Sequence, residues 1–346
     1  MRQREAFDVK KPRAGGKSLT VGAAWLLLFV LSGFVPLAAR AAGIRDFAIP
    51  ADENGQRILA ELWTPCAAPA SEIVVNNDTW PVAIRGVKDC AIPQKNLPFV
   101  IISHGLFGDR FSHHDTAEFL ADAGFAVVSL NHTQDSVLSY NAKSASDISP
   151  FLVRPIDIKR VIDWLTVHPP AGVEIDQNRI GLFGFSRGGY TGLVLSGAVP
   201  DFHHPGFPCL EKTPLCREMS DNNIPAHPAG YEPRIKAYVL ADPLSFFSDK
   251  RTLGAVKAPI QLWSSALGGM GVTPENVAAI AQNLPVNPEF HPVANSTHMS
   301  FIFPCTRDFA KTNPPLVCTD PPGFDRTEFH KNFNAEVLKF FQQNLP

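Results

Sequence analysis

The feature that most constrains how this chain can fold is a serine between two glycines, where a buried apolar run gives way to small residues. Residues 181–192 read GLFGFSRGGYTG, so Gly184 and Gly188 flank Ser186 in the pattern G-x-S-x-G. A strand, a sharp strained turn at the serine and a helix are expected in that order. Larger side chains at the two glycines would collide with the neighbouring strand and helix. The alternative is an ordinary serine in a glycine-rich bend, and the flanking sequence favours the strained turn.

Apolar runs and amphipathic stretches alternate along the chain. Strands are expected at 57–65, 97–105, 125–133, 179–186, 235–243, 258–266 and 289–297. Helices are expected at 111–124, 154–168, 187–199 and 326–345. The first helix is expected to begin with a capping box of Ser112 and Asp115 and to end at Gly124. The predicted fold class is therefore α/β, with a mostly parallel central sheet and helices on both faces.

One stretch breaks this alternation. Residues 199–234 are rich in proline and fit neither a strand nor a regular helix. We expect an inserted loop after the helix that follows Ser186, on the side of the sheet where loops overhang a cleft. The sequence leaves open whether this insertion acts as a lid or is a passive surface excursion.

The N-terminal segment has the order of a secretory signal. Basic residues come first, an uncharged apolar run follows, and the small-residue pattern Ala39-Arg40-Ala41 ends it. We expect cleavage after about Ala41, so that 1–41 is a signal peptide and 42–346 a single domain in the periplasm or outside the cell. The alternative is an uncleaved membrane anchor, because an apolar run of about 19 residues is just long enough to span a bilayer.

All six cysteines follow the predicted signal. An even number in an exported chain indicates disulfide bonds, and near neighbours close with the least loss of chain entropy. The expected pairs are Cys66 with Cys90, Cys209 with Cys216, and Cys305 with Cys318. The alternative for each pair is two buried free thiols.

Charge and motifs exclude several classes of function. The formal net charge is −2, and no basic block with interleaved aromatic residues occurs, so nucleic acid is not an expected partner. No phosphate-binding glycine loop or dinucleotide fingerprint is present, and no cofactor is expected. His113-His114-Asp115 and Asp201-His203-His204 lack the spacing of zinc ligands, and we interpret them as solvated loop and cap residues.

A serine hydroxyl becomes a strong nucleophile only when a base removes its proton and an acid orients that base. In proteins with this strand-turn-helix motif the chain order is Ser, then Asp or Glu, then His. Of the later histidines, only His298 lies in a loop directly after an expected strand. Asp242 ends the expected strand 235–243, at the sheet edge where catalytic groups gather. Ser186, Asp242 and His298 are therefore the predicted nucleophile, acid and base. The alternatives are a helix cap for Asp242 and a hydrogen-bonded loop histidine for His298.

Acyl transfer also needs hydrogen-bond donors for the oxyanion that develops on the substrate. One expected donor is the backbone N–H of Arg187, directly after the nucleophile. The other should come from the loop ISHGLFGDR after an earlier strand, where Leu106 N–H is the candidate. His104 in this loop is expected to hold the turn without carrying a proton, and plain packing is the alternative.

Five segments also carry a resemblance to a known family. SHGLFGDR, VVSLNHTQDS, GFSRGG, VLADP and STHMSF occur in this order, and the likeness spans about residues 55 to 345. As a set they resemble the platelet-activating-factor acetylhydrolase family and the related bacterial dienelactone-hydrolase-like group, all α/β-hydrolases. The resemblance implies Ser186 as nucleophile, Asp242 as acid, His298 as base, and the amides of Leu106 and Arg187 as oxyanion donors.

The chain also departs from these families. The animal enzymes have histidine and phenylalanine in place of Phe185 and Arg187, and the proline-rich insertion is longer here. True dienelactone hydrolases use cysteine where this chain has Ser186. We therefore expect a different acyl pocket and carry over no phospholipid specificity.

Together these features predict an exported serine hydrolase that cleaves short-acyl or lipid-like carboxylic esters through an acyl-enzyme. The expected partner is a small-molecule or lipid ester, with no stable membrane anchor after signal cleavage. One alternative is a peptidase or amidase of the same fold, and another is a catalytically silent binding protein on a hydrolase scaffold. The sequence leaves the natural substrate, the acyl length and the oligomeric state open.

Overall fold

A computed structural model describes residues 41–76, 81–92, 94–139, 147–170, 172–206, 214–220, 230–247 and 249–346. The predicted signal peptide lies outside these ranges except for Ala41, the first residue of strand β1. The boundary between signal and domain therefore stays a prediction. Within the described ranges, no helix is both long enough and apolar enough to cross a membrane.

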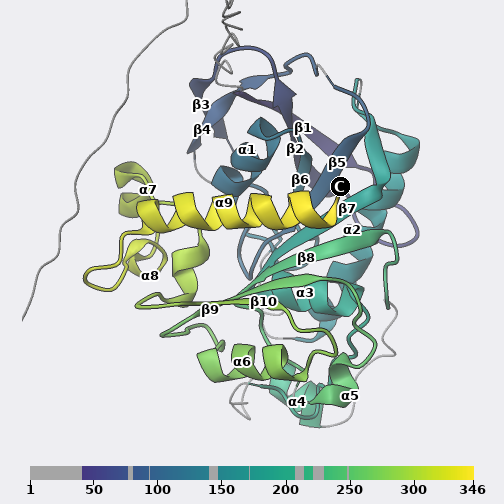
Figure 1. The fold of residues 1–346 in the computed structure, drawn as a ribbon, viewed down its shortest axis with the longest axis vertical. Coiled ribbons are helices and arrows are strands. Elements are labelled where there is room, and N and C mark those ends of the chain that lie inside the picture. The colour runs from purple at the N-terminus through teal and green to yellow at the C-terminus, as the bar shows by residue number, and fades with distance from the viewer. Residues whose placement is uncertain are drawn as a thin grey trace, which may run out of the picture. The chain divides into compact units, whose positions relative to one another are not determined.

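The described strands form one sheet in the order β10-β9-β8-β7-β5-β6-β2-β1-β4-β3 (Figure 1). Their bounds are β1 Ala41–Ile49, β2 Ile58–Cys66, β3 Ser71–Asn76, β4 Pro81–Lys88, β5 Leu97–Ser103, β6 Ala126–Leu130, β7 Ile175–Phe185, β8 Ile235–Ala241, β9 Ile260–Ser265 and β10 Glu289–Val293. All neighbours from β10 to β6 are parallel, whereas β2 pairs antiparallel with both β6 and β1. The mostly parallel sheet is confirmed, and each expected strand is present.

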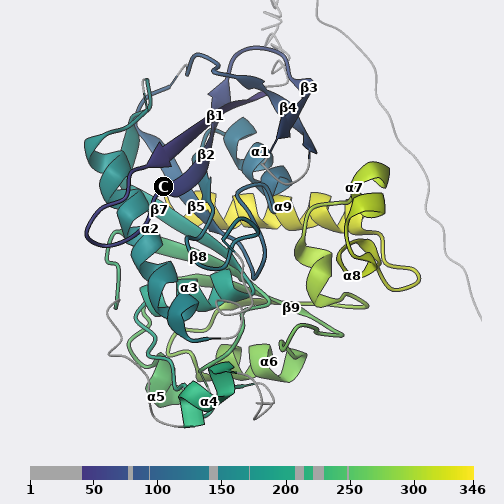
Figure 2. The same ribbon diagram turned by 180° about the vertical axis from the view of Figure 1, so that it is seen from behind.

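Helices cover both faces of the sheet. Their bounds are α1 His114–Asp122, α2 Ser149–Val167, α3 Arg187–Leu195, α4 Pro214–Ser220, α5 Lys250–Leu253, α6 Pro274–Asn283, the 3-10 helix η1 His298–Phe301, α7 Arg307–Thr312, α8 Pro315–Cys318 and α9 Arg326–Asn344. Side chains of α2, α3 and α6 enter the apolar core on one face, and those of α1 and α9 enter the core on the other. Figure 1 shows α9 across the near face, and Figure 2 shows α2 and α3 on the opposite side.

The start of α1 differs from the prediction. His113 is its N-cap residue and no side chain caps it, so the predicted capping box of Ser112 and Asp115 is wrong. Ser112 Oγ accepts a hydrogen bond from the Asp109 amide at 2.9 Å. Asp115 instead accepts a hydrogen bond from His330 Nδ1 on α9 at 2.6 Å. The Asp115 carboxylate, which the local sequence pattern assigned to the helix cap, is therefore engaged in a tertiary contact with α9.

The start of α2 also differs. Apolar residues at helical spacing predict a helix that starts at residue 154. The helix begins at Ser149 with Pro150 in its first turn, and Pro155 lies inside it. The extra turn brings Phe151 into the buried core.

The proline-rich insertion contains a short helix that was not expected. Within 199–234 the structure describes 199–206, 214–220 and 230–234, and α4 is formed by Pro214–Ser220. Leu215 and Met219 of this helix are buried in the core. Apolar anchoring stabilises this helix even though it is too short to show a clear helical period.

Two of the three predicted disulfides are confirmed. Cys66 at the end of β2 bonds to Cys90 after β4, and Cys305 bonds to Cys318 at the end of α8. Cys209 lies outside the described residues, so its predicted bond to Cys216 stays a prediction.

Candidate active site

Ser186 lies on a sharp turn between β7 and α3, with φ 56° and ψ −115°. This conformation is strained for any residue other than glycine. The Ser186 amide donates to Ala241 O on β8 at 3.0 Å, and its carbonyl accepts from the amides of Tyr190 at 3.1 Å and Leu244 at 3.0 Å. These bonds to a strand, a helix and a loop hold the strained backbone in place.

The two motif glycines are required by close backbone approach. A Cβ atom on Gly184 would collide with the backbone of Gly188, and a Cβ atom on Gly188 would collide with the backbone of Ser103 on β5. Both glycines therefore let β7 turn tightly into α3 and let α3 pack against β5, as the sequence pattern predicts.

His298 is oriented by the carboxylate of Asp242. The distance from His298 Nδ1 to Asp242 Oδ2 is 2.8 Å. The same carboxylate accepts from the Ser265 amide at 2.8 Å and from the Ser265 hydroxyl at 2.6 Å. Asp242 is 0% and His298 2% exposed. Because a carboxylate accepts from Nδ1–H, the Nε2 atom of the neutral imidazole is left as a proton acceptor.

Two further contacts fix the imidazole. The His298 amide donates to Gly268 O at 2.8 Å. Its ring stacks on Phe185, with centroids 4.6 Å apart and planes inclined by 29°. Phe185 directly precedes Ser186, so the ring that supports the histidine is attached to the strained turn.

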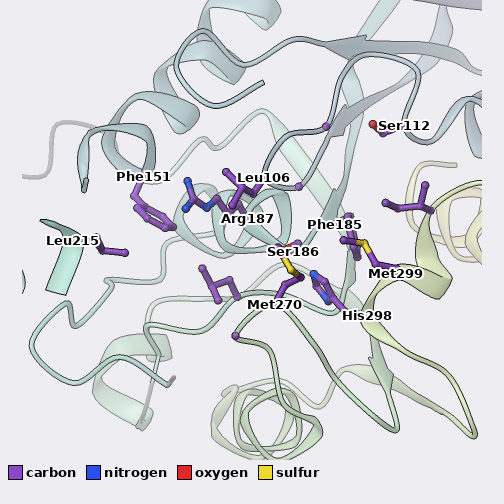
Figure 3. A pocket seen from close by; sticks show the side chains of 15 residues that line it. Leu106, Ser112, Phe151, Phe185, Ser186, Arg187, Leu215, Met270, His298 and Met299 are labelled. Atoms are coloured by element: carbon purple, nitrogen blue, oxygen red, sulfur yellow. The ribbon is translucent and has the colours of Figure 1, made fainter. Parts of the chain in front are cut away.

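Ser186 and His298 line one pocket (Figure 3). It has a volume of about 150 Å³, and most of its other side chains are apolar, among them Phe151, Leu215, Leu244, Met270, Met299 and Ile302. Leu215 belongs to α4, so the proline-rich insertion supplies part of the wall. Asp242 contacts His298 at Nδ1 but does not itself line the pocket.

Parallel strand order explains why these distant residues meet. Ser186 follows β7, Asp242 follows β8, His298 follows β10, and Leu106 lies in the loop after β5. The carboxyl ends of parallel strands lie at one edge of a sheet. The four positions predicted from strand ends are therefore brought to the same edge.

Leu106 and Arg187 border the serine from two sides. Leu106 lines the pocket, and its N–H donates to no acceptor in the part of the chain that the structure describes. Arg187 is the first residue of α3, where backbone N–H groups have no acceptor within the helix. A Cβ atom on Gly105 would lie 3.2 Å from Ser186 Cβ, which shows how closely this loop approaches the serine.

A buried ionic cluster that the motifs did not reveal lies beneath this loop. Asp135 accepts from Arg154 Nε at 2.9 and 3.0 Å and from Arg187 Nη1 at 3.1 Å. Burial acts to raise the pKa of Asp135, but the two guanidinium groups outweigh it and hold that pKa well below its ordinary range. The only sequence signal was the presence of charged residues beside apolar runs, which does not identify the partners.

His104 has the surroundings expected of a structural histidine. Its Nδ1 lies 2.6 Å from Gly105 O, and its Nε2 accepts from the His132 amide at 3.1 Å. Burial and the nearby Arg154 charge lower the pKa of His104 well below its ordinary value. The imidazole is therefore neutral and donates from Nδ1.

The interpretation of His113-His114-Asp115 as solvated residues is wrong. His113 is 1% exposed between the rings of Phe183 and Phe185, and burial lowers its pKa to about 3. His114 pairs with Glu118 at 2.9 Å. Apolar packing on the buried side of α1 accounts for this difference.

In the other cluster, His204 is exposed and pairs with Asp201 at 2.9 Å. Over the described ranges, no group of three or more histidine, cysteine or acidic side chains has the arrangement of a metal site.

Comparisons with known proteins identify the fold. No protein-family model matches the chain, and no curated protein matches it. Among solved structures, a ferulic acid esterase from Streptomyces cinnamoneus is similar, with a TM-score of 0.59 over 90% of this chain and 91% of that chain. Sequence identity is 15%, so this likeness concerns the fold alone. The chain has the α/β-hydrolase fold, as predicted.

Proposed function

We propose that this protein is a serine hydrolase that cleaves carboxylic esters through an acyl-enzyme. The observation that carries the proposal is the strained Ser186 in one pocket with His298, whose Nδ1 is held 2.8 Å from Asp242 Oδ2. Acyl transfer requires a nucleophile, a base and a buried carboxylate that orients the base.

The proposed reaction has two halves. His298 Nε2 takes the Ser186 proton as Oγ attacks the ester carbonyl, and Asp242 stabilises the imidazolium that forms. The amides of Leu106 and Arg187 bind the oxyanion of the tetrahedral intermediate. Collapse of that intermediate releases the alcohol, to which His298 returns the proton. Water activated by His298 then releases the acid from Ser186 in the same manner.

The pocket favours esters with a compact, uncharged acyl group. Its volume is about 150 Å³ and its walls are mainly leucine, isoleucine, phenylalanine and methionine side chains. Arg187 also lines the pocket, but its guanidinium already binds Asp135, so a charged acyl group would lose its hydration there with little compensation. The solved relative is named an esterase, which agrees with ester hydrolysis.

Two finer points belong to the same proposal. Export to the periplasm or the medium is supported by the Cys66–Cys90 and Cys305–Cys318 bonds, because disulfides persist in oxidising compartments. A closer relation to the acetylhydrolase and dienelactone-hydrolase-like groups rests on the ordered sequence segments.

The test is covalent labelling combined with turnover. A fluorophosphonate probe should label the protein at Ser186, and p-nitrophenyl esters from acetate to octanoate should be hydrolysed, with short chains preferred. Ser186→Ala should lose both reactions while its Tm stays close to that of the parent. Ser196→Ala is the matched control, since Ser196 is 1% exposed at the end of the same helix and bonds only locally to Leu193 O at 2.7 Å.

The outcomes separate the alternatives. Retained hydrolysis in folded Ser186→Ala would remove Ser186 as nucleophile. Cleavage of peptide anilides in preference to esters would favour the peptidase or amidase. Folded parent protein that neither reacts with the probe nor hydrolyses any ester would favour a silent binding protein.

A further inference from the structure

The peptide between Gly105 and Leu106 is anchored at its carbonyl end. Gly105 O accepts from His104 Nδ1 at 2.6 Å, from Arg154 Nη2 at 3.1 Å and from the Gly108 amide at 3.2 Å. In a planar trans peptide the C=O and N–H groups point in opposite directions. Anchoring this oxygen therefore directs the Leu106 N–H away from the buried cluster, and Leu106 itself lines the pocket.

Arg154 is the charged member of these three donors. Its Nη1 donates to His104 O at 2.7 Å and its Nη2 to Gly105 O, so one guanidinium holds two consecutive carbonyls. Arg154 is 1% exposed. Hydrogen bonds from a charged donor are stronger than neutral ones, and a low-dielectric site strengthens them further. A donor on the carbonyl also polarises the peptide, which makes its N–H a better donor.

The same cluster also contacts Arg187, the residue that directly follows Ser186. The Asp135 carboxylate binds Arg154 and also accepts from Arg187 Nη1 at 3.1 Å. The Asp135 backbone carbonyl accepts from the Phe107 amide at 3.1 Å. One buried carboxylate thus ties the loop after β5 to the first residue of α3.

We propose that Arg154 is a positioning residue, which aims the Leu106 N–H at the substrate oxyanion by clamping the carbonyls of His104 and Gly105. It does so without touching the substrate, because Arg154 lies outside the pocket lining. This inference rests on the proposed function, in which Leu106 N–H is an oxyanion donor.

The test compares two arginines of one helix. Arg154→Lys keeps the charge but cannot reach both carbonyls and Asp135 together. Arg160→Lys is the matched control: Arg160 is 5% exposed on α2 and binds the Asp52 carboxylate and the carbonyls of Pro50 and Gln56. Its guanidinium also lies 3.9 Å from Asp157, beside which lysine keeps the positive charge, and among the described residues it donates to neither His104 O nor Gly105 O. Active sites are counted by fluorophosphonate labelling at completion, so that misfolded molecules do not enter kcat. Arg154→Gln, which retains one N–H donor group, replaces Arg154→Lys if the latter does not fold.

Relative to Arg160→Lys, we expect the Arg154 variant to lose at least about 10-fold in kcat with p-nitrophenyl butyrate, with KM changed little. The second readout is the affinity for an alkyl trifluoromethyl ketone, which forms a tetrahedral oxyanion with the serine. That affinity should fall in parallel with kcat/KM, while the affinity for the corresponding alcohol, which forms no oxyanion, should not change. A general structural defect would weaken both ligands.

Two results would overturn different claims. If the parent protein neither hydrolyses esters nor reacts at Ser186, the proposed function fails and this inference fails with it. If the parent is active and the Arg154 variant matches Arg160→Lys in kcat and in ketone affinity, the function stands and the positioning role of Arg154 is wrong.

Discussion

Replacing Asp242 by asparagine tests how far the chemistry depends on the orientation of one imidazole. Asp242 Oδ1 faces the Ser265 amide at 2.8 Å, so an NH₂ group there would set two donors against each other. The asparagine NH₂ is therefore expected at the Oδ2 position, 2.8 Å from His298 Nδ1. The Ser265 hydroxyl, which also meets Oδ2, can rotate its proton away and accept.

In that arrangement His298 Nδ1 has to accept a hydrogen bond, and its proton moves to Nε2. The imidazole then carries a proton on the nitrogen that should receive one from Ser186. A histidine fixed in the wrong tautomer costs a serine hydrolase about 10⁴-fold in kcat. At about 1.36 kcal/mol for each factor of ten, this raises the barrier by about 5.4 kcal/mol.

The assay is hydrolysis of p-nitrophenyl butyrate at neutral pH. The rate of Ser186→Ala at the same protein concentration is subtracted first, and the remainder is divided by the concentration of labelled sites to give kcat. Asp249→Asn is the control, because Asp249 caps α5 through the amides of Arg251 and Thr252 and has no contact with the site. Tm should change little for Asp242→Asn, since the amide preserves the side-chain shape. A folded Asp242→Asn variant that keeps more than about a tenth of the parent kcat would refute the assignment of Asp242 as the orienting acid.

Two further predictions concern stability. Burial raises the pKa of Glu61 to about 8 from 4.5, so the free energy of unfolding should fall by up to about 1.36 kcal/mol per pH unit between these values. Glutamine cannot ionise, so the stability of Glu61→Gln should not fall in this way. The Tm of Glu61→Gln minus the Tm of the parent should therefore increase from pH 5 to pH 8. A difference in Tm that is independent of pH would contradict the prediction. Serine pairs at Cys66/Cys90 and Cys305/Cys318, which are 24 and 13 residues apart, should lower the free energy of unfolding by about 3.4 and about 2.9 kcal/mol. Urea unfolding without reductant measures both, and unchanged midpoints would show that the crosslinks contribute nothing.

The site residues were predictable because each depends on a local pattern and a strand end. Gly184 and Gly188 indicate the tight turn around Ser186, and Asp242 follows an apolar run that identifies a strand. His298 follows the expected strand 289–297, which is more polar. The parallel strand order then brings these ends together, with no need to know any individual side-chain contact. The structure brings these residues to one edge of the sheet, and their catalytic roles stay a proposal.

The Arg154 cluster was beyond prediction for the opposite reason. Arg154 and Asp135 are 19 residues apart on separate elements, and Arg187 is 52 residues from Asp135. No period or spacing relates these charges, since they meet only after α2 has packed on the sheet. Asp115, the predicted cap residue, bonds instead to His330, and these two residues are 215 positions apart in the sequence.

The N-terminal strands β1, β3 and β4 were not predicted because their signal is weak. In β4 buried and exposed side chains alternate, and β3 lies at the edge of the sheet. Such strands lack the continuous apolar run that marks a strand buried on both faces. Helix α4 was missed for a similar reason, because its seven residues are too few to establish a helical period.

The order of strands also separates two regions with different tolerance to change. Every described residue that lines the pocket lies between positions 105 and 302, whereas β3 and β4 end the sheet on the far side of β6, β2 and β1. A carrier protein, a purification tag or a solid support attached at the β3 edge would therefore be joined away from the strands whose ends carry the pocket residues. Engineering of selectivity belongs instead at Leu215, Met270 and Ile302, where a change of side-chain volume alters the cavity directly.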